Sequence, residues 1–260
     1  MARAHRLLWP ALLFLLTAHA ALAQKEGRGA DNQIGGTDDG VITVHFPDSV
    51  VVVNPDNGAL QTDKDANAVN VAAFARKAME QVIRAGLFDE VKRELLDGGV
   101  LDEKGVLQKV NIEFEVFQNE AALLKEIERD LSKDLADEKK KLYEDLKKED
   151  PSMTVGGFSY FRKGDHFVLK IGAFFVYRAK HGEDDPATKD VDERRQAHDL
   201  LRTLIIHELA HIELFAYPVA GKESFPYHGD QWKHVFQKLL DKMSAWLAAN
   251  PTEGYIPLPK

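Results

Sequence analysis

Apolar residues recur at helical spacing in several parts of the chain. In the segment 66–86 they include Val71, Phe74 and Val82, which predicts an amphipathic helix. A shorter helix is expected over 88–96, ended by the Asp-Gly-Gly run that follows it. Both segments therefore have one face that needs a partner to cover it.

The segment 120–148 combines dense charge with a narrow apolar stripe, and we expect one long helix there. The stripe consists of Leu124, Ile127, Leu131, Leu135, Leu142 and Leu146. A coiled-coil dimer is an alternative use of such a stripe, but there are few clean heptads, so packing within the chain is favoured.

Other segments show the alternation or the short apolar runs that are typical of strands. Runs at 41–46 and 49–53 are separated by Pro-Asp. The segment 110–116 alternates apolar and polar residues, which predicts a strand half open to water. The segments 158–161 and 166–177 flank a charged, Gly-containing turn and predict a hairpin.

Two further helices are expected near the C-terminus. The first begins at a capping box, Asp190 to Glu193, and continues to Tyr217, where Pro218 should end it. The second begins near His228 and ends at Asn-Pro, with a continuous apolar stripe. That stripe consists of Trp232, Val235, Phe236, Leu239, Leu240, Met243, Trp246 and Leu247.

The first of these helices carries the motif His-Glu-Leu-Ala-His. His207 and His211 are four residues apart, so both imidazoles reach the same side of the helix, among large aliphatic residues. Glu208 lies about 100° round the axis, where a carboxylate can meet metal-bound water without binding the metal. Two buried histidines satisfied by hydrogen bonds are the structural alternative, but one cation uses both lone pairs at once.

A third ligand is needed, and its identity separates the known classes of zinc peptidase. Leu214 and Tyr217 stand where a metzincin has Gly and His, so that class is excluded. A downstream glutamate is the gluzincin solution, and Glu223 is available. His228 is favoured because it stands where a second helix begins and can meet the histidine pair.

The motif HExxH followed by His228-Gly229-x-x-Trp232 resembles the SprT-like zincin metallopeptidases, over about residues 190–245. The resemblance implies a zinc ion held by His207, His211 and His228, with Glu208 as general base. It also implies that Trp232 is a packing residue of the second helix.

Composition argues against the DNA-related role of the best-known members of that family. The chain has no cysteine, so it cannot form a cysteine-based zinc ribbon. Its formal charge is −8 and becomes −10 if residues 1–23 are removed, because they hold two arginines and no acid (32 basic against 42 acidic side chains). We therefore expect no nucleic-acid partner.

The first 23 residues have the organisation of a signal peptide. Arg3 and Arg6 precede an apolar run over 7–16, and an A-x-A-like site follows, ending at Ala23. The run is shorter than the roughly 20 apolar residues of a membrane span. We therefore expect export to the periplasm or the medium with no stable membrane anchor after cleavage, and an uncleaved anchor is the alternative.

Together these features predict an α+β fold. We expect a zincin-like catalytic domain with an active-site helix, a second C-terminal helix and a small mixed or antiparallel sheet. The expected organisation is a signal peptide (1–23), a flexible leader (24–40), an N-terminal α/β region (41–150) and the zincin-like core (151–260). The region 24–105 is either regulatory or part of the catalytic fold.

The expected activity is peptide hydrolysis through zinc-bound water activated by Glu208. Tyr217 and Tyr227 are both candidates for stabilising the reacting oxygen, and Asp230 and Glu213 for orienting the ligands. In zincins a strand before the active-site helix pairs with extended substrate, so the segment Val168–Val176 is the candidate, with a buried core strand as the alternative.

Two other functions are compatible with the same residues. One is a non-catalytic zincin-like module that binds metal or a partner without turnover, although Glu208 would then have no use. The other is metal-dependent hydrolysis of a non-peptide substrate. The oligomeric state is not predicted.

Overall fold

The computed structural model describes residues 32–47, 52–53, 69–99, 101, 109–149, 155–163, 166–184, 191–219 and 228–256. The chain divides into two units after Gln33, and the elements that matter here belong to the unit that begins at Ile34.

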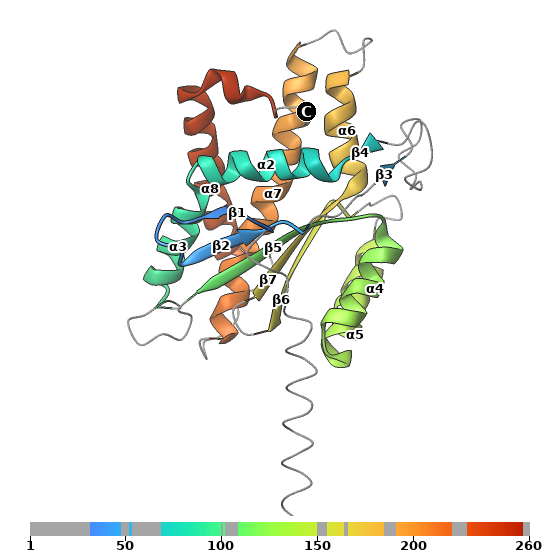
Figure 1. Cartoon of the computed structure of the whole chain (residues 1–260). Coiled ribbons are helices and arrows are strands. Elements are labelled where there is room, and N and C mark those ends of the chain that lie inside the picture. The colour runs from blue at the N-terminus through green and yellow to red at the C-terminus, as the bar shows by residue number, and fades with distance from the viewer. Residues whose placement is uncertain are drawn as a thin grey trace, which may run out of the picture. The chain divides into compact units, whose positions relative to one another are not determined.

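The elements of the described residues mix helices and strands in an α+β arrangement (Figure 1). In chain order they are β1 (Gln33–Gly36), β2 (Ile42–His45), β3 (Val52–Val53), β4 (Val69–Asn70), α2 (Ala72–Arg84), α3 (Leu87–Asp97), β5 (Val110–Phe117), α4 (Glu120–Asp130), α5 (Lys133–Glu149), β6 (Gly157–Lys163), β7 (His166–Gly172), α6 (Ala173–Asp184), α7 (Val191–Val219), α8 (Asp230–Ala249) and the 3-10 helix η2 (Pro251–Gly254).

Five of the strands form one mixed sheet, in the order β1-β2-β5-β7-β6. Strand β5 runs parallel to both β2 and β7, and β6 runs antiparallel to β7. Strands from the region 41–150 and from the region 151–260 therefore share one sheet. β6 forms one edge, and β3 and β4 form a separate two-stranded ladder.

Helices cover both faces of the sheet. Successive side chains of a strand point to opposite faces, so alternate residues of one strand enter different cores. In β7, Phe167 and Leu169 join the larger core, which α2, α3, α6, α7 and α8 complete. Val168 points the other way and packs with Leu123 and Ile127 of α4 in a smaller core. Figure 1 shows α4 and α5 on this second side of the sheet.

A buried lysine also faces the second side of the sheet. Lys170 is fully buried, and its ammonium group pairs with Glu115 of β5 and, at 2.8 Å, with Glu126 of α4. A buried charge needs such partners, since leaving it unpaired in the interior is costly. The pairing therefore ties α4 to the middle of the sheet.

The prediction for the segment 166–177 is wrong in its second half. The strand β7 ends at Gly172, and helix α6 follows at once. Ala173, Val176 and Tyr177 are buried, which is i, i+3, i+4 spacing, whereas Phe174 is 40% exposed. The residues 173–177 are all apolar, so their sequence suited a buried strand as well as a helix.

The segment Val168–Val176 is also not a substrate-binding edge. β7 lies between β5 and β6, so both of its hydrogen-bonding sides are occupied by neighbouring strands. The alternative of a buried core strand is the one that the structure supports. The edge strand that contacts α7 is β6.

The predicted long helix over 120–148 is two helices. α4 ends where Leu131 adopts an extended conformation, and α5 begins at Lys133. Tyr143 of α5 donates a hydrogen bond to Glu120 at the start of α4, so the two helices form a hairpin. Of the predicted stripe, Ile127 is buried and Leu135 is 47% exposed.

The remaining boundaries agree with the predictions more closely. α2 begins at Ala72 rather than at residue 66, because residues 69–70 form β4. α3 matches the expected helix at 88–96, and β2 the expected strand at 41–46. Helix α7 runs to Val219, so Pro218 lies in its last turn, where the missing N–H removes a single bond near the helix end.

Two further expectations need correction, one about the exposure of β5 and one about the leader 24–40. The strand β5 is not half open to water, because Glu113 on its polar face is buried. The expected leader 24–40 contains β1, whose Gly36 lies so close to β2 that a Cβ atom would be 2.0 Å from the Ile42 carbonyl oxygen. A glycine-rich segment has the composition of a loop, but its glycines here allow two strands to approach closely.

The predicted signal peptide lies outside the described residues. Among the residues that the structure describes, no helix combines the length and apolar character that crossing a membrane requires.

Candidate metal centre

Helix α7 presents His207, Glu208 and His211 on the side that faces β6 and α8. His211 is completely buried, the side chain of His207 is 30% exposed, and Glu208 is 3% exposed. Ile205, Ile206 and Leu209 anchor the same stretch of helix in the larger core. The motif is therefore fixed on a rigid element rather than on a loop.

His228 reaches the same place from the start of α8. Gly229 is the N-cap of that helix, and His228 immediately before it has a φ of 57°. This left-handed conformation costs a residue with a Cβ atom roughly 1–2 kcal/mol. Residues held in such a conformation cluster at functional sites, where the surrounding structure maintains it.

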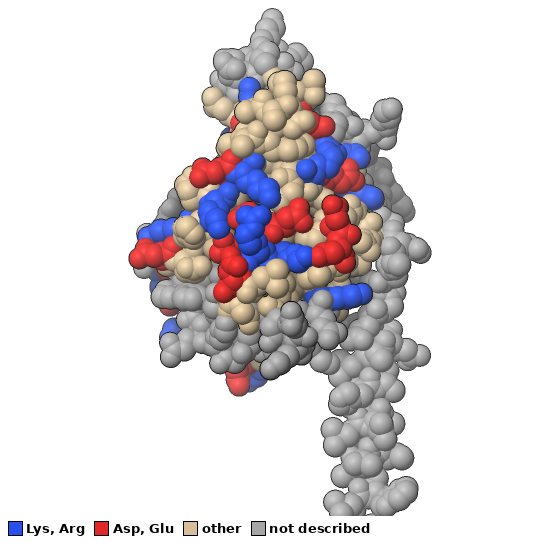
Figure 2. Space-filling view, turned by 90° about the vertical axis from the view of Figure 1, so that its left-hand side faces the viewer, with Lys and Arg blue, Asp and Glu red and all other residues tan. Residues whose placement is uncertain are grey.

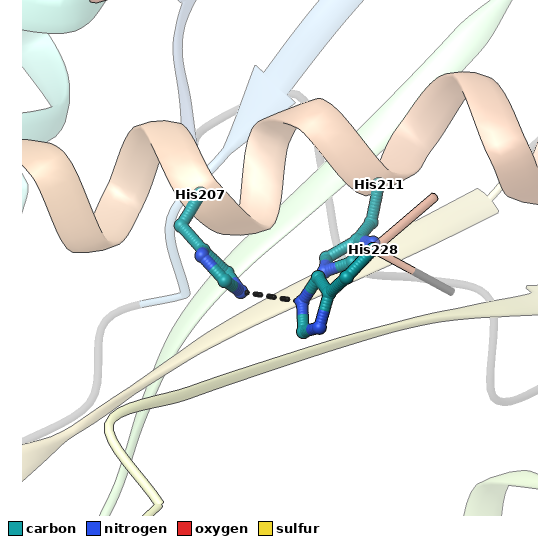
Figure 3. Close-up of side chains that lie close together, drawn as sticks. All are labelled: His207, His211 and His228. Atoms are coloured by element: carbon teal, nitrogen blue, oxygen red, sulfur yellow. Dashed lines mark hydrogen bonds between the residues drawn. The ribbon is translucent and has the colours of Figure 1, made fainter. Parts of the chain in front are cut away.

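The three imidazoles converge on one point (Figure 3). One ligand nitrogen from each of His207, His211 and His228 lies within 4.8 Å of the others, and Nε2 of His207 is 3.1 Å from Nε2 of His228. Zn–N bonds of 2.0–2.1 Å in a tetrahedron separate two nitrogens by about 3.3 Å. The three histidines are therefore close enough to hold one metal ion.

Trp232 closes the site from the side of α8. Its ring is stacked on His211, with centroids 5.4 Å apart and an interplanar angle of 26°. It also meets His228 and His207 edge to face, at 4.5 and 4.7 Å. Phe236 also stacks on the indole, with centroids 4.8 Å apart. Trp232 thus contacts every candidate ligand, which is more than the packing role that the family resemblance implied.

The surroundings keep the histidines neutral, as metal ligation requires. Burial lowers the pKa of His207 to about 4, with a smaller contribution from the charge of His228. Burial likewise lowers the pKa of His211, and that of His228 to a smaller extent. Each ring therefore offers a lone pair at neutral pH.

Glu208 lies beside the histidines, packed against the edge strand β6. Its Oε1 is 3.9 Å from Nε2 of His207. Burial raises the pKa of Glu208 to about 8, and the Ser159 hydroxyl acts in the opposite direction. Oε2 makes no hydrogen bond of ordinary geometry with any described residue. A buried carboxylate with an unsatisfied oxygen suits a place beside a cation, which would favour its charged form.

The structure thus brings together all four residues that the sequence singled out, and it changes the status of the supporting ones. The carboxylate of Asp230 is wholly exposed and lies 3.4 Å from the ammonium group of Lys233, so it does not orient a ligand. The side chains of Glu213, Tyr217, Glu223 and Tyr227 lie outside the described residues.

Sequence reasoning missed Gly157 and Ser159, the β6 residues that face Glu208. A pair of glycines at the start of an expected strand was the available signal, because glycine in a strand often marks a close approach. The pattern did not show which segment approaches.

On the face shown in Figure 2, basic and acidic side chains are interspersed. Arg84 pairs with Glu253 at 2.6 Å, and Lys238 pairs with Glu94 and Glu90. A face of this kind has no single-sign stripe that would follow a phosphate backbone.

Comparisons of the chain with models of protein families, with curated proteins and with solved structures found no match.

Proposed function

We propose that this protein is a zinc-dependent peptidase, exported by means of its N-terminal segment, with His207, His211 and His228 as metal ligands and Glu208 as general base. The observation that carries the proposal is the convergence of three neutral imidazoles with a buried carboxylate beside them. A structural metal site needs a fourth ligand and has no use for such a carboxylate.

The donor set favours zinc among the common cations. Three imidazole nitrogens and no thiolate are the ligands of catalytic zinc sites that keep one position open. When bound, zinc supplies a Lewis acid and brings the pKa of a coordinated water molecule to about 7. Among the described residues, no other group of three His, Asp or Glu side chains has the required geometry.

Glu208 has the position and surroundings of a proton carrier. Its carboxylate lies next to the ligand nitrogen of His207 but is not among the residues whose donor atoms converge. A general base accepts the proton of the attacking water and then delivers it to the leaving amine. A cation beside it would favour the charged carboxylate that accepts the proton, and burial favours the neutral form that then holds it.

The proposed substrate class is protein or peptide, and it rests on the resemblance to the SprT-like peptidases. The HExxH motif and the later His-Gly-x-x-Trp motif supply the residues that meet at the site. The absence of cysteine and the net charge of −8 favour a peptidase without a nucleic-acid partner.

The test is Glu208→Gln, which keeps the shape of the side chain and removes its basicity. We expect one zinc ion per chain, as in the wild type, and a loss of casein cleavage of at least about 100-fold. Glu144→Gln on the exposed side of α5 is the control and should cleave normally. Full activity of Glu208→Gln would show that the base is another group, and a wild type that binds zinc without cleaving any peptide would favour a non-catalytic module.

A further inference from the structure

The edge strand β6 starts with a glycine that lies directly on the carboxyl group of Glu208. A Cβ atom at Gly157 would be 2.6 Å from Oε1, 2.7 Å from Cγ and 2.9 Å from Cδ of Glu208. Real Cβ atoms do not approach neighbouring atoms so closely. The site therefore has room for the carboxyl group only because residue 157 has no side chain.

Ser159 continues the same surface of β6. It is two residues after Gly157, so both point to the face that meets α7. Ser159 is 3% exposed, and its hydroxyl lies close enough to Glu208 to favour the charged carboxylate, although it makes no hydrogen bond of ordinary geometry. Tyr160 points the other way, into the smaller core.

We propose that Gly157 and Ser159 form a cradle that fixes the carboxyl group of Glu208, so that the edge strand positions the base relative to the three histidines. This inference rests on the proposed function, because it assigns positioning residues to the same site. Both residues face Glu208, so both act through it.

The cradle is needed because a glutamate side chain has three rotatable bonds and no fixed place of its own. Helix α7 determines only where the side chain begins. Contact with Gly157 on one side leaves Oε1 3.9 Å from Nε2 of His207. General-base catalysis requires the carboxylate to stay within hydrogen-bond reach of its proton donor, so a displacement of about 1 Å is costly.

The neighbouring glycine provides a matched control. A Cβ atom at Gly156 would be 3.0 and 3.3 Å from the two Cδ atoms of Leu204 and 3.4 Å from Phe175, which are longer distances than those at Gly157. The substitution Gly156→Ala adds the same methyl group one residue away without meeting Glu208. It reports the general effect of an alanine at the start of β6.

The first test uses metal-free protein and thermal unfolding, so it depends on neither zinc nor activity. Gly157→Ala should lower the Tm by several degrees, on the order of 5 °C, because overpacking a buried contact is destabilising. In a Glu208→Ala background the same substitution should change the Tm by no more than about 1 °C. Gly156→Ala should behave alike in both backgrounds.

Two outcomes would overturn the proposal. One is an equal loss of Tm from Gly157→Ala in the presence and absence of the Glu208 side chain. The other is a Gly157→Ala protein that keeps the wild-type Tm. If the single variant does not fold, folding of the double variant supports the cradle, and failure of both variants contradicts it.

The second test measures the consequence for the zinc-loaded protein. Ser159→Ala and Gly157→Ala should lower kcat on casein peptides by about tenfold or more, with KM and zinc affinity within about twofold of wild type. Ser159→Thr, which retains the hydroxyl, should recover part of the loss. If Glu208→Gln is inactive but both cradle variants have the wild-type kcat, the cradle is wrong and the proposed function stands. If Glu208→Gln is active, the proposed function itself fails.

Discussion

At the scale of single residues, the site depends on a strained backbone at one histidine and on a tryptophan that packs against all three histidine rings. His228 adopts a left-handed backbone conformation, and Trp232 contacts all three histidine rings. The identity of His207, Glu208 and His211 could be predicted because a helix fixes the relation of residues three or four apart. The contacts of Trp232 could not, since they depend on how α8 crosses α7.

Trp232 provides the prediction that belongs to this scale. Its replacement by Ala removes a buried indole, which should lower the free energy of unfolding by about 3–5 kcal/mol. Loss of the surface that holds the rings should also weaken zinc binding by about 10–100-fold, the usual effect of residues that orient ligands. Competition with a chromophoric chelator and urea unfolding measure the two effects.

Trp246 is the matched control, because it lies on the same helix. It is only partly buried and packs on the larger core. Trp246→Ala should reduce stability and leave the zinc affinity unchanged. Equal zinc affinities for Trp232→Ala and Trp246→Ala would contradict the role given to Trp232.

At the scale of elements, periodicity predicted most helices and strands, but it missed the points where one element gives way to the next. The break between α4 and α5 contains no Gly or Pro, and Tyr143 of α5 returns to contact Glu120 of α4. The change from strand to helix at Ala173 was not predicted for a related reason, since the apolar run 173–177 suits both structures. Such choices are made by packing partners that are distant in sequence.

The end of α4 gives an element-scale prediction with a defined pH dependence. Asp130 accepts a hydrogen bond from Tyr160 of β6 at 2.7 Å and pairs with Arg129 at 2.8 Å. Burial acts to raise its pKa, but the hydrogen bonds from Arg129 and Tyr160 outweigh it, so the pKa is lowered. A lowered pKa in the folded state means stability that is present above the unfolded value, near 4, and is lost as the pH falls through the folded value.

We therefore expect Asp130→Asn to be less stable than wild type at pH 7 by about 1–2 kcal/mol. The difference should shrink below about pH 4 and vanish in more acidic solution, because the wild-type carboxylate is then protonated. Urea unfolding of both proteins between pH 7 and pH 2.5 measures it. Asp137→Asn, at an exposed position of α5, is the control, and a difference for Asp130→Asn that is constant with pH would contradict this account.

At the scale of the whole molecule, the residues from Ile34 onward form one unit whose sheet draws strands from both predicted regions. Residues 253–255, after α8, bind back to α2 and α7 of this unit. Arg202 of α7 is buried and donates hydrogen bonds to Gln81 of α2 and to the carbonyl oxygen of Gly254, each at 2.8 Å. The segment before residue 105 is thus represented in the core around the site, through β2, α2 and α3.

The sequence predicted the α+β class and the candidate ligands, and the structure supplied the order of the strands. Strand order could not be predicted, because it depends on which helix covers which strand. The apolar faces of the helices and strands are alike in composition and do not specify the pairing. The two helices that carry the ligands were predicted from their own periodicity, so the candidate ligands follow from the sequence although the strand order does not.

The central claim is that three imidazoles from α7 and the start of α8 bind one divalent ion. The most direct measurement is the zinc content and zinc affinity of the purified protein, wild type against His228→Ala, with His234→Ala, an exposed histidine of α8, as the control. We expect one zinc ion per chain for wild type and His234→Ala, and an affinity at least about 100-fold lower for His228→Ala. A wild type that holds no stoichiometric metal, or a His228→Ala protein that binds zinc as tightly as wild type, would contradict the account.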